Sequence, residues 1–143
     1  MADKSLWSEG NLMWMAGLLE GEGWFRYIED PIKSYYGLEI GCSMTDEDVI
    51  NKLKLLAGFG RIYAYASRKI NAKEQLAGWV TVRKPIWSWR ASAMQDVIDL
   101  ELAILPLMGI RRQQQIVSSH EKRAEFERNY VTSTRGRIRR YFT

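Results

Sequence analysis

The sequence predicts an α+β domain in which helices cover one face of a four-stranded antiparallel sheet. Segments with apolar residues at helical spacing are interspersed with alternating, aromatic segments, in the order helix, two strands, helix, two strands, helices. No low-complexity tract, internal repeat or proline-rich linker divides the 143 residues, a length that suits one domain with a sizeable core. We therefore expect a single domain over 1–143.

The first half of the chain predicts helix, strand, strand and helix. Ser8 is placed to cap the first helix, and apolar residues follow helical spacing from Leu12 to Leu19. Gly21 and Gly23 are expected to stop this helix. Strands are then predicted over 24–29 and 35–44, and a helix capped by Thr45 or Asp46 is predicted to run through about Leu56.

The second half predicts two more strands and two helices. The strands are expected from Arg61 and over 86–92, and the helices over about 93–105 and 110–128, with Pro106 between them. Residues 69–86 are harder to place: the segment GWVTV is consistent with a hairpin extension, whereas Pro85 should interrupt a central ladder.

Strand alternation predicts a polar outer sheet face, opposite the helices. A twisted sheet with such a face can enter the major groove of DNA and contact base edges. The alternative is an ordinary solvated sheet face. The residues predicted on this face are Trp24, Arg26, Ile28, Tyr35, Gly37, Glu39, Arg61, Tyr63, Tyr65, Ser67, Ser88 and Arg90.

The charge distribution is consistent with a polyanionic partner. Residues 111–143 hold nine Lys and Arg against three Glu, while residues 1–110 hold twelve against fourteen acids. A solvated basic helix is the alternative. The sequence has no apolar run long enough to predict a membrane span or a secretory signal. The single Cys42 suits a reducing, intracellular compartment. With His120 as the only histidine, any metal site would use oxygen ligands, as magnesium-like ions prefer.

The segment MAGLLEGEG (15–23) places two acids at the C-terminal end of a helix, where the helix dipole disfavours them. Gly21 allows the backbone to turn, so that Glu22 would lie beside unpaired carbonyl groups and form a site for a hard cation. The alternative is that Glu20 and Glu22 are simply solvated. Small residues Ala16 and Gly17 would also let a second helix approach closely, or pack against the chain's own sheet.

The same segment closely resembles the nine-residue signature of the LAGLIDADG homing endonucleases, with Glu at both acidic positions. LPLMGIRRQQ (105–114) is similar to the family's later motif, and the order of elements between the two also fits. The resemblance covers about 8–128, leaving a basic extension at 129–143. It implies a saddle-shaped fold whose sheet straddles DNA, and a homodimer because one motif copy is present.

The resemblance also implies roles for individual residues. Glu22, with the Gly21 carbonyl, would hold Mg²⁺, for which Mn²⁺ can substitute, and Arg111 would lie near the scissile phosphate, with Arg112 as the alternative. Ser43 or Asp46 would order water. Met13, Ala16, Gly17 and Glu20 would form the dimer interface, and the basic tail would add phosphate contacts from Arg135, Arg137, Arg139 and Arg140.

The implied activity is site-specific double-strand cleavage of a long, near-palindromic DNA target, leaving short 3′ overhangs. The alternative is a non-catalytic nucleic-acid binder on the same scaffold, such as an intron RNA maturase. The presence of an acid at position 22 favours the endonuclease, since a binder could lose it.

Overall fold

A computed structural model describes residues 1–30, 35–65, 71–78 and 84–134. Its helices are α1 (Glu9–Glu22), α2 (Glu47–Ala57), α3 (Ala72–Leu76), α4 (Met94–Ile104), the 3₁₀ turn η1 (Leu105–Leu107) and α5 (Ile110–Thr134). The strands are β1 (Gly23–Asp30), β2 (Tyr35–Met44), β3 (Arg61–Tyr65) and β4 (Ile86–Ala91). The predicted α+β class and the four-stranded antiparallel sheet are confirmed.

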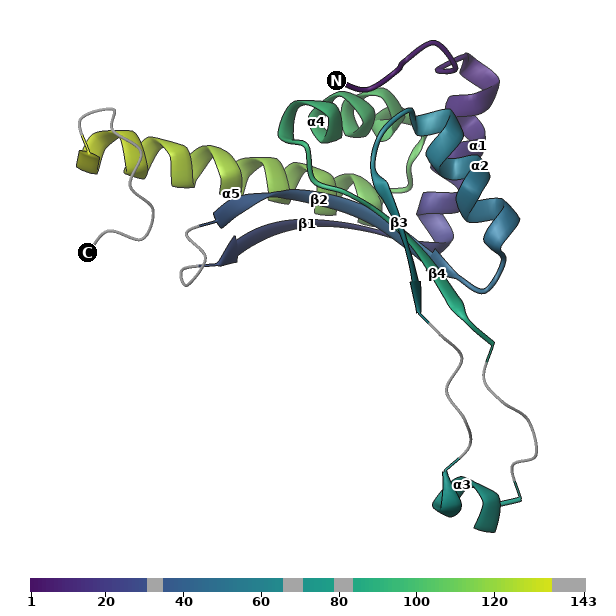
Figure 1. Cartoon of the computed structure of the whole chain (residues 1–143). Coiled ribbons are helices and arrows are strands. Elements are labelled where there is room, and N and C mark those ends of the chain that lie inside the picture. The colour runs from purple at the N-terminus through teal and green to yellow at the C-terminus, as the bar shows by residue number, and fades with distance from the viewer. Residues whose placement is uncertain (31–34, 66–70, 79–83, 135–143) are drawn as a thin grey trace.

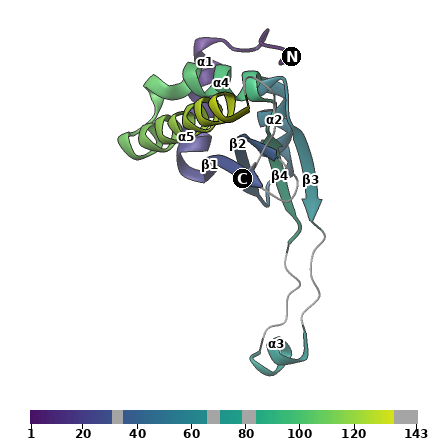
Figure 2. The same ribbon diagram turned by 90° about the vertical axis from the view of Figure 1, so that its left-hand side faces the viewer.

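The sheet has the strand order β1-β2-β4-β3, so β2 and β4 lie at its centre. Figure 1 shows α1, α2, α4 and α5 on one side of the curved sheet, whose opposite face is open. The view turned by 90° shows β3 and β4 leading down from the body toward α3 (Figure 2). This arrangement leaves one sheet face uncovered by helices.

The core lies between the sheet and these helices. Phe25, Leu38, Ile40, Cys42 and Trp89 come from the inner sheet face and are buried. They pack in one cluster with apolar side chains from the helices, namely Met15, Ala16, Leu19, Ile50, Leu53, Leu56, Val97, Leu100, Ile104 and Ile116. Burial of this apolar cluster is the main force that holds the helices to one face.

One local feature of the fold differs from the sequence prediction. The five-residue helix α3 was not predicted. Its signal is Asn71, whose side-chain oxygen caps the helix by accepting a hydrogen bond from the backbone N–H of Glu74 at 2.9 Å.

The C-terminal part of the chain also differs from the prediction in extent. Helix α5 continues to Thr134, six residues beyond the predicted end at Arg128. Most of the segment GWVTV and all four predicted tail arginines fall within 79–83 and 135–143, which lie outside the described residues. None of the helices in the described ranges is long and apolar enough to cross a bilayer.

Candidate nucleic-acid interface and catalytic centre

Helix α1 begins and ends as its sequence predicts, with one correction. The Ser8 hydroxyl accepts a hydrogen bond from the backbone N–H of Asn11 at 3.2 Å, which confirms the predicted N-cap. Gly21 does not break the helix: α1 continues through Glu22, and Gly23 is the C-cap in an extended conformation. Glu22 is therefore the last helical residue, and its side chain is exposed.

The location of Glu20 answers why an acid is tolerated at this helix end. Its carboxylate accepts a hydrogen bond from the backbone N–H of Gly109, the residue before α5. The Gly109 carbonyl in turn accepts the first helical hydrogen bond of α5, from Gln113 at 3.0 Å. Glu20 thus lies at the negative end of its own helix but also at the positive end of α5, where a carboxylate is favoured.

Arg112 completes this connection between the two helices. It is buried, its Nε donates to the backbone carbonyl of Glu20 at 3.0 Å, and the same Nε lies 3.6 Å from a carboxylate oxygen of Glu20. Its Nη1 donates to Gln115 at 2.9 Å. Arg112 is therefore occupied within the chain, whereas its neighbour Arg111 is exposed. Of the two arginines predicted near the scissile phosphate, Arg111 is the one free to face a ligand.

Glu22 lies close to Cys42 on the neighbouring strand. Gly23 and Cys42 are paired across β1 and β2. Burial, and secondarily the negative charge of Glu22, raises the pKa of the Cys42 thiol to about 11. At neutral pH the free thiol keeps its proton and packs as a small apolar group in the core. The polar groups at this helix end are the Glu22 carboxylate and the carbonyl oxygens of the last helical turn.

The outward face of α1 carries three glycines and one exposed methionine. A Cβ atom built at Gly10, Gly17 or Gly21 would meet no atom within 4 Å, and Met13 on the same face is 55% exposed. Ala16 is different: it is 2% exposed and faces the chain's own core, which corrects the expectation that it lies at a dimer surface. Glu20, also expected there, is engaged with α5.

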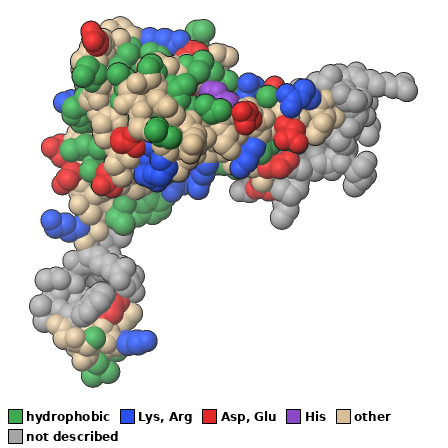
Figure 3. Space-filling model, turned by 180° about the vertical axis from the view of Figure 1, so that it is seen from behind, with side chains coloured by type: hydrophobic (Ala, Val, Ile, Leu, Met, Phe, Trp, Pro, Cys, Tyr) green, Lys and Arg blue, Asp and Glu red, His purple; other side chains and the backbone are tan. Residues whose placement is uncertain are grey.

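Strand alternation places the expected side chains on the open sheet face. The pairs Trp24–Gly41, Arg26–Glu39, Gly41–Arg90, Ser43–Ser88 and Tyr63–Ser88 fix this face across all four strands. Ser67 and the side chain of Tyr35 lie outside the described part of the structure. Seen from behind, Lys and Arg side chains gather along the lower edge of the body (Figure 3).

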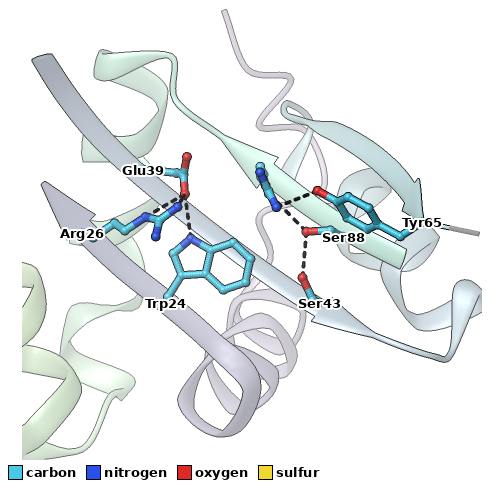
Figure 4. A network of polar contacts seen from close by, with 7 residues as sticks. Trp24, Arg26, Glu39, Ser43, Tyr65 and Ser88 are labelled. Carbon is cyan, nitrogen blue, oxygen red and sulfur yellow. Dashed lines mark hydrogen bonds and ion pairs between the residues drawn. The ribbon is translucent and has the colours of Figure 1, made fainter. Parts of the chain in front are cut away.

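Two hydrogen-bonded clusters organise the centre of the open face (Figure 4). In the first, one oxygen of Glu39 accepts hydrogen bonds from Trp24 Nε1 at 2.9 Å, Arg26 Nε at 2.9 Å and Arg26 Nη2 at 2.6 Å. The indole of Trp24 lies across Gly41, where a Cβ would fall 2.2 Å from the ring. Gly41 is thus the residue that makes room for Trp24, a relation that the sequence did not reveal.

The second cluster is built around Arg90. Its Nη2 donates to the hydroxyl of Tyr65 at 2.8 Å, and its Cζ lies 5.4 Å from the centroid of the Tyr63 ring. Ser88 is on the same face but is completely buried, with its hydroxyl 2.7 Å from that of Ser43. Ser88 supports its neighbours and has no surface of its own to offer DNA in the free chain.

A four-stranded antiparallel sheet with helices on one face, in this order of elements, is the fold of the LAGLIDADG homing endonucleases, and this chain has that fold. The solved structures that resemble it include the archaeal intron-encoded homing endonuclease I-Vdi141I complexed with DNA, with 13% identity and a TM-score of 0.56. The similarity covers 85% of this chain and 70% of that one.

Two further structures show the same likeness. The group I intron-encoded homing endonuclease I-CeuI, complexed with DNA, has 12% identity and a TM-score of 0.58 over 89% of this chain and 59% of its own. The LAGLIDADG meganuclease I-AabMI, bound to uncleaved DNA, has 14% identity and a TM-score of 0.53 over 87% and 40%. No family model and no curated protein matches the sequence.

Proposed function

We propose that this chain is a site-specific DNA endonuclease that acts as a homodimer and hydrolyses phosphodiester bonds with divalent metal ions. The observation that carries the proposal is the exposed carboxylate of Glu22 at the end of α1, where the helix meets the first residue of β1. The open sheet face would bind DNA, and the solved structures with the same fold are homing endonucleases in complex with DNA.

The residues at the end of α1 fit a magnesium-like ion. Hard divalent cations prefer carboxylate and carbonyl oxygens, which Glu22 and the last-turn carbonyl of Gly21 can supply. Within the described residues, no group of three or more His, Cys, Asp and Glu could hold a metal. One chain therefore offers an incomplete set of ligands, and a second copy of Glu22 across a two-fold axis would add to it. The structure of I-CvuI, which has a similar fold, is known with its own target in the presence of Ca, and with the I-CreI target in the presence of Mg, where the DNA is not cleaved.

The dimer would form through the open face of α1. Gly10, Gly17 and Gly21 leave space in which a second α1 can approach closely, and this face does not serve the chain's own core. A two-fold axis along it would bring two copies of Glu22 together and two sheet faces into line. A symmetric protein of this kind would bind a long, near-palindromic target and cut both strands, leaving short 3′ overhangs.

Each residue of the centre has a separate task in the proposed reaction. When bound, a divalent ion would offset the charge that develops on the attacking and leaving oxygens. Glu22 would hold it, and the free guanidinium of Arg111 would stabilise negative charge on the phosphate. The candidates for ordering water are Ser43, which is half-buried near the end of β2, and Asp46, the exposed N-cap residue of α2.

The decisive variant is Glu22→Gln, which keeps the shape of the side chain but removes its charge. We expect magnesium-dependent double-strand cleavage by the wild type, cleavage slowed by a factor of about 100 or more in the variant, and retained DNA binding. Glu121→Gln, an exposed change on α5, is the matched control. The substrate can be isolated by cleavage selection from a DNA library. Equal cutting by Glu22→Gln and wild type would refute the catalytic assignment.

A non-catalytic nucleic-acid binder, such as an intron RNA maturase, is the second candidate. It is favoured by the substitution of Glu for Asp at position 22, since the longer side chain alters the reach to a metal ion. Selective binding of DNA or structured RNA by the wild type, with no cleavage in Mg²⁺ or Mn²⁺, would support this candidate over the endonuclease.

A further inference from the structure

Glu39 is an acid at the centre of a surface that otherwise suits DNA. Its side chain is only 13% exposed, and it directly opposes Arg26, which is 55% exposed, across β1 and β2. A surface built only to attract phosphate would not retain a carboxylate at this position, because the acid cancels the charge of its neighbour. The pair is better suited to a partner that offers both hydrogen-bond acceptors and a donor.

The hydrogen bonds of Arg26 leave part of its guanidinium available. A guanidinium carries five N–H donors, and Glu39 takes one from Nε and one from Nη2. Three donors remain, on Nη1 and Nη2, and they form the outer edge of the fork. Since Trp24 donates to the same Glu39 oxygen, the carboxylate and the guanidinium are both fixed in orientation before any ligand arrives.

Glu39 also keeps one oxygen available. All three donors converge on Oε1, and within the described part of the chain no hydrogen bond to Oε2 is formed. Figure 4 shows this second oxygen pointing away from Arg26 and Trp24. Glu39 also lines a hollow with Arg61, Tyr63 and Arg90. The open face therefore presents a fixed pair of donors next to a fixed acceptor.

This arrangement matches the major-groove edge of one base pair. Guanine presents N7 and O6 as acceptors, and the paired cytosine presents its N4 amino group as a donor in the same row. An adenine–thymine pair places an amino group where guanine has O6 and an oxygen where cytosine has N4, so it would face both side chains with the wrong group. Arg26 and Glu39 together are complementary to guanine–cytosine in one orientation.

We propose that Arg26 and Glu39 act as one specificity-determining unit that selects a guanine–cytosine pair in each half-site, with guanine at Arg26 and cytosine at Glu39. The proposal rests on the proposed DNA binding and adds a base preference to it. Trp24 is a positioning residue, which holds Glu39 through its indole N–H. Because the pair is nearly neutral, its contribution is to specificity more than to overall affinity.

The test is binding selection from a randomised DNA library, with Ca²⁺ in place of Mg²⁺ to limit cleavage, for wild type, Glu39→Gln and Arg26→Lys. Lysine keeps the charge of Arg26 but lacks the planar fork. The matched control is Glu29→Gln, an exposed acid of β1 on the opposite side of the strand. We expect both variants to lose discrimination at the same guanine–cytosine pair, by roughly ten-fold or more, while the other positions and the control keep theirs.

Several outcomes would overturn the proposal. If the two variants relax different positions, or none, the residues do not act as a unit. If Glu39→Gln binds all sequences more tightly and equally, the acid only weakens phosphate attraction. If Glu39→Gln melts at a lower temperature than wild type, Arg26→Lys still tests the inference, because Arg26 is the more exposed residue of the pair. A wild type that selects no sequence would overturn the proposed DNA function itself, whereas a clear consensus without the expected pair would overturn this inference alone.

Discussion

Glu101 is a buried acid whose ionisation is linked to the stability of the fold. It lies on α4 with 1% of its side chain exposed, and its Oε1 is 3.0 Å from Nε2 of His120 on α5. Burial raises the pKa of Glu101 above its usual value, and the hydrogen bond and charge of His120 partly oppose this effect. The chain's single histidine is thus the hydrogen-bonding partner of a buried acid.

Replacing Glu101 with Gln should change how stability depends on pH. A group whose pKa is raised by folding favours the native state below its unfolded pKa, and this advantage is lost as pH rises through the folded value. From about pH 4.3 upward, where an unfolded Glu ionises, wild type should therefore lose stability relative to Glu101→Gln. Denaturant unfolding of both proteins from pH 4 to pH 8 measures the difference, with Glu121→Gln as control. A difference independent of pH would contradict this explanation.

The connection between α1 and α5 fixes the positions of the residues proposed to be catalytic. Glu20 and Arg112 join the end of α1 to the start of α5. Glu22, proposed to hold the metal ion, lies two positions after Glu20, and Arg111, proposed to contact the phosphate, directly precedes Arg112. Under the proposed function the two acids of the motif therefore have different roles, since Glu20 joins the helices and Glu22 would hold the metal ion. In the same way Arg112 joins the helices and Arg111 would contact the phosphate.

Substitution of the two arginines should separate these tasks. Arg112→Ala removes a buried guanidinium and its hydrogen bonds to Glu20, and we expect it to reduce the free energy of unfolding by about 1–3 kcal/mol. Arg111→Ala alters an exposed side chain, so stability should change by less than about 0.5 kcal/mol while cleavage slows markedly. Denaturant unfolding and a cleavage assay on the same samples compare the two effects. Loss of stability in Arg111→Ala alone would mean that the assignment of the two arginines is reversed.

The elements themselves were predictable to the extent that local signals determine them. Ser8 marks the start of α1, and apolar spacing and strand alternation gave every strand and the long helices. The alternation also assigned the open face correctly, because the side-chain period of a strand is fixed. Asn71 is a typical N-cap residue and could have predicted α3. The prediction for this region was instead based on the segment GWVTV and on Pro85.

Contacts between distant elements were not predictable from local patterns. The partner of Glu20 is Gly109, 89 positions away, and nothing near Glu20 in the sequence indicates it. Ala16 shares the small size of Gly17 but lies about 100° away around the helix, on the buried side. Gly41 was counted only as a strand residue, although Trp24 depends on its lack of a side chain. Predicting such contacts requires knowledge of the cross-strand register and of how each helix is oriented on the sheet.

At the scale of the whole molecule, the two proposed binding surfaces are the open sheet face and the glycine face of α1, and neither packs against the core. The helices occupy one side of the sheet and the open face lies opposite (Figure 1). The glycines of α1 border open space. The two proposed surfaces, for DNA and for a second chain, meet where α1 ends and β1 begins. Dimer formation would therefore align two open sheet faces along one duplex, and the loss of the dimer should abolish cutting without unfolding the chain.

Gly17→Leu tests this expectation. The added side chain enters open space in a single chain, and leucine favours a helix over glycine by about 0.5–1 kcal/mol, so the fold should be retained or slightly stabilised. In a dimer, however, leucine would separate the two helices and the two copies of Glu22. We expect a dimer for wild type by light scattering, a monomer for Gly17→Leu with an unreduced melting temperature, and no double-strand cleavage. Asn51→Leu, on the exposed side of α2, controls for an added apolar group. A wild type that is monomeric both free and on DNA, or a Gly17→Leu variant that still dimerises and cuts, would exclude α1 as the dimer surface.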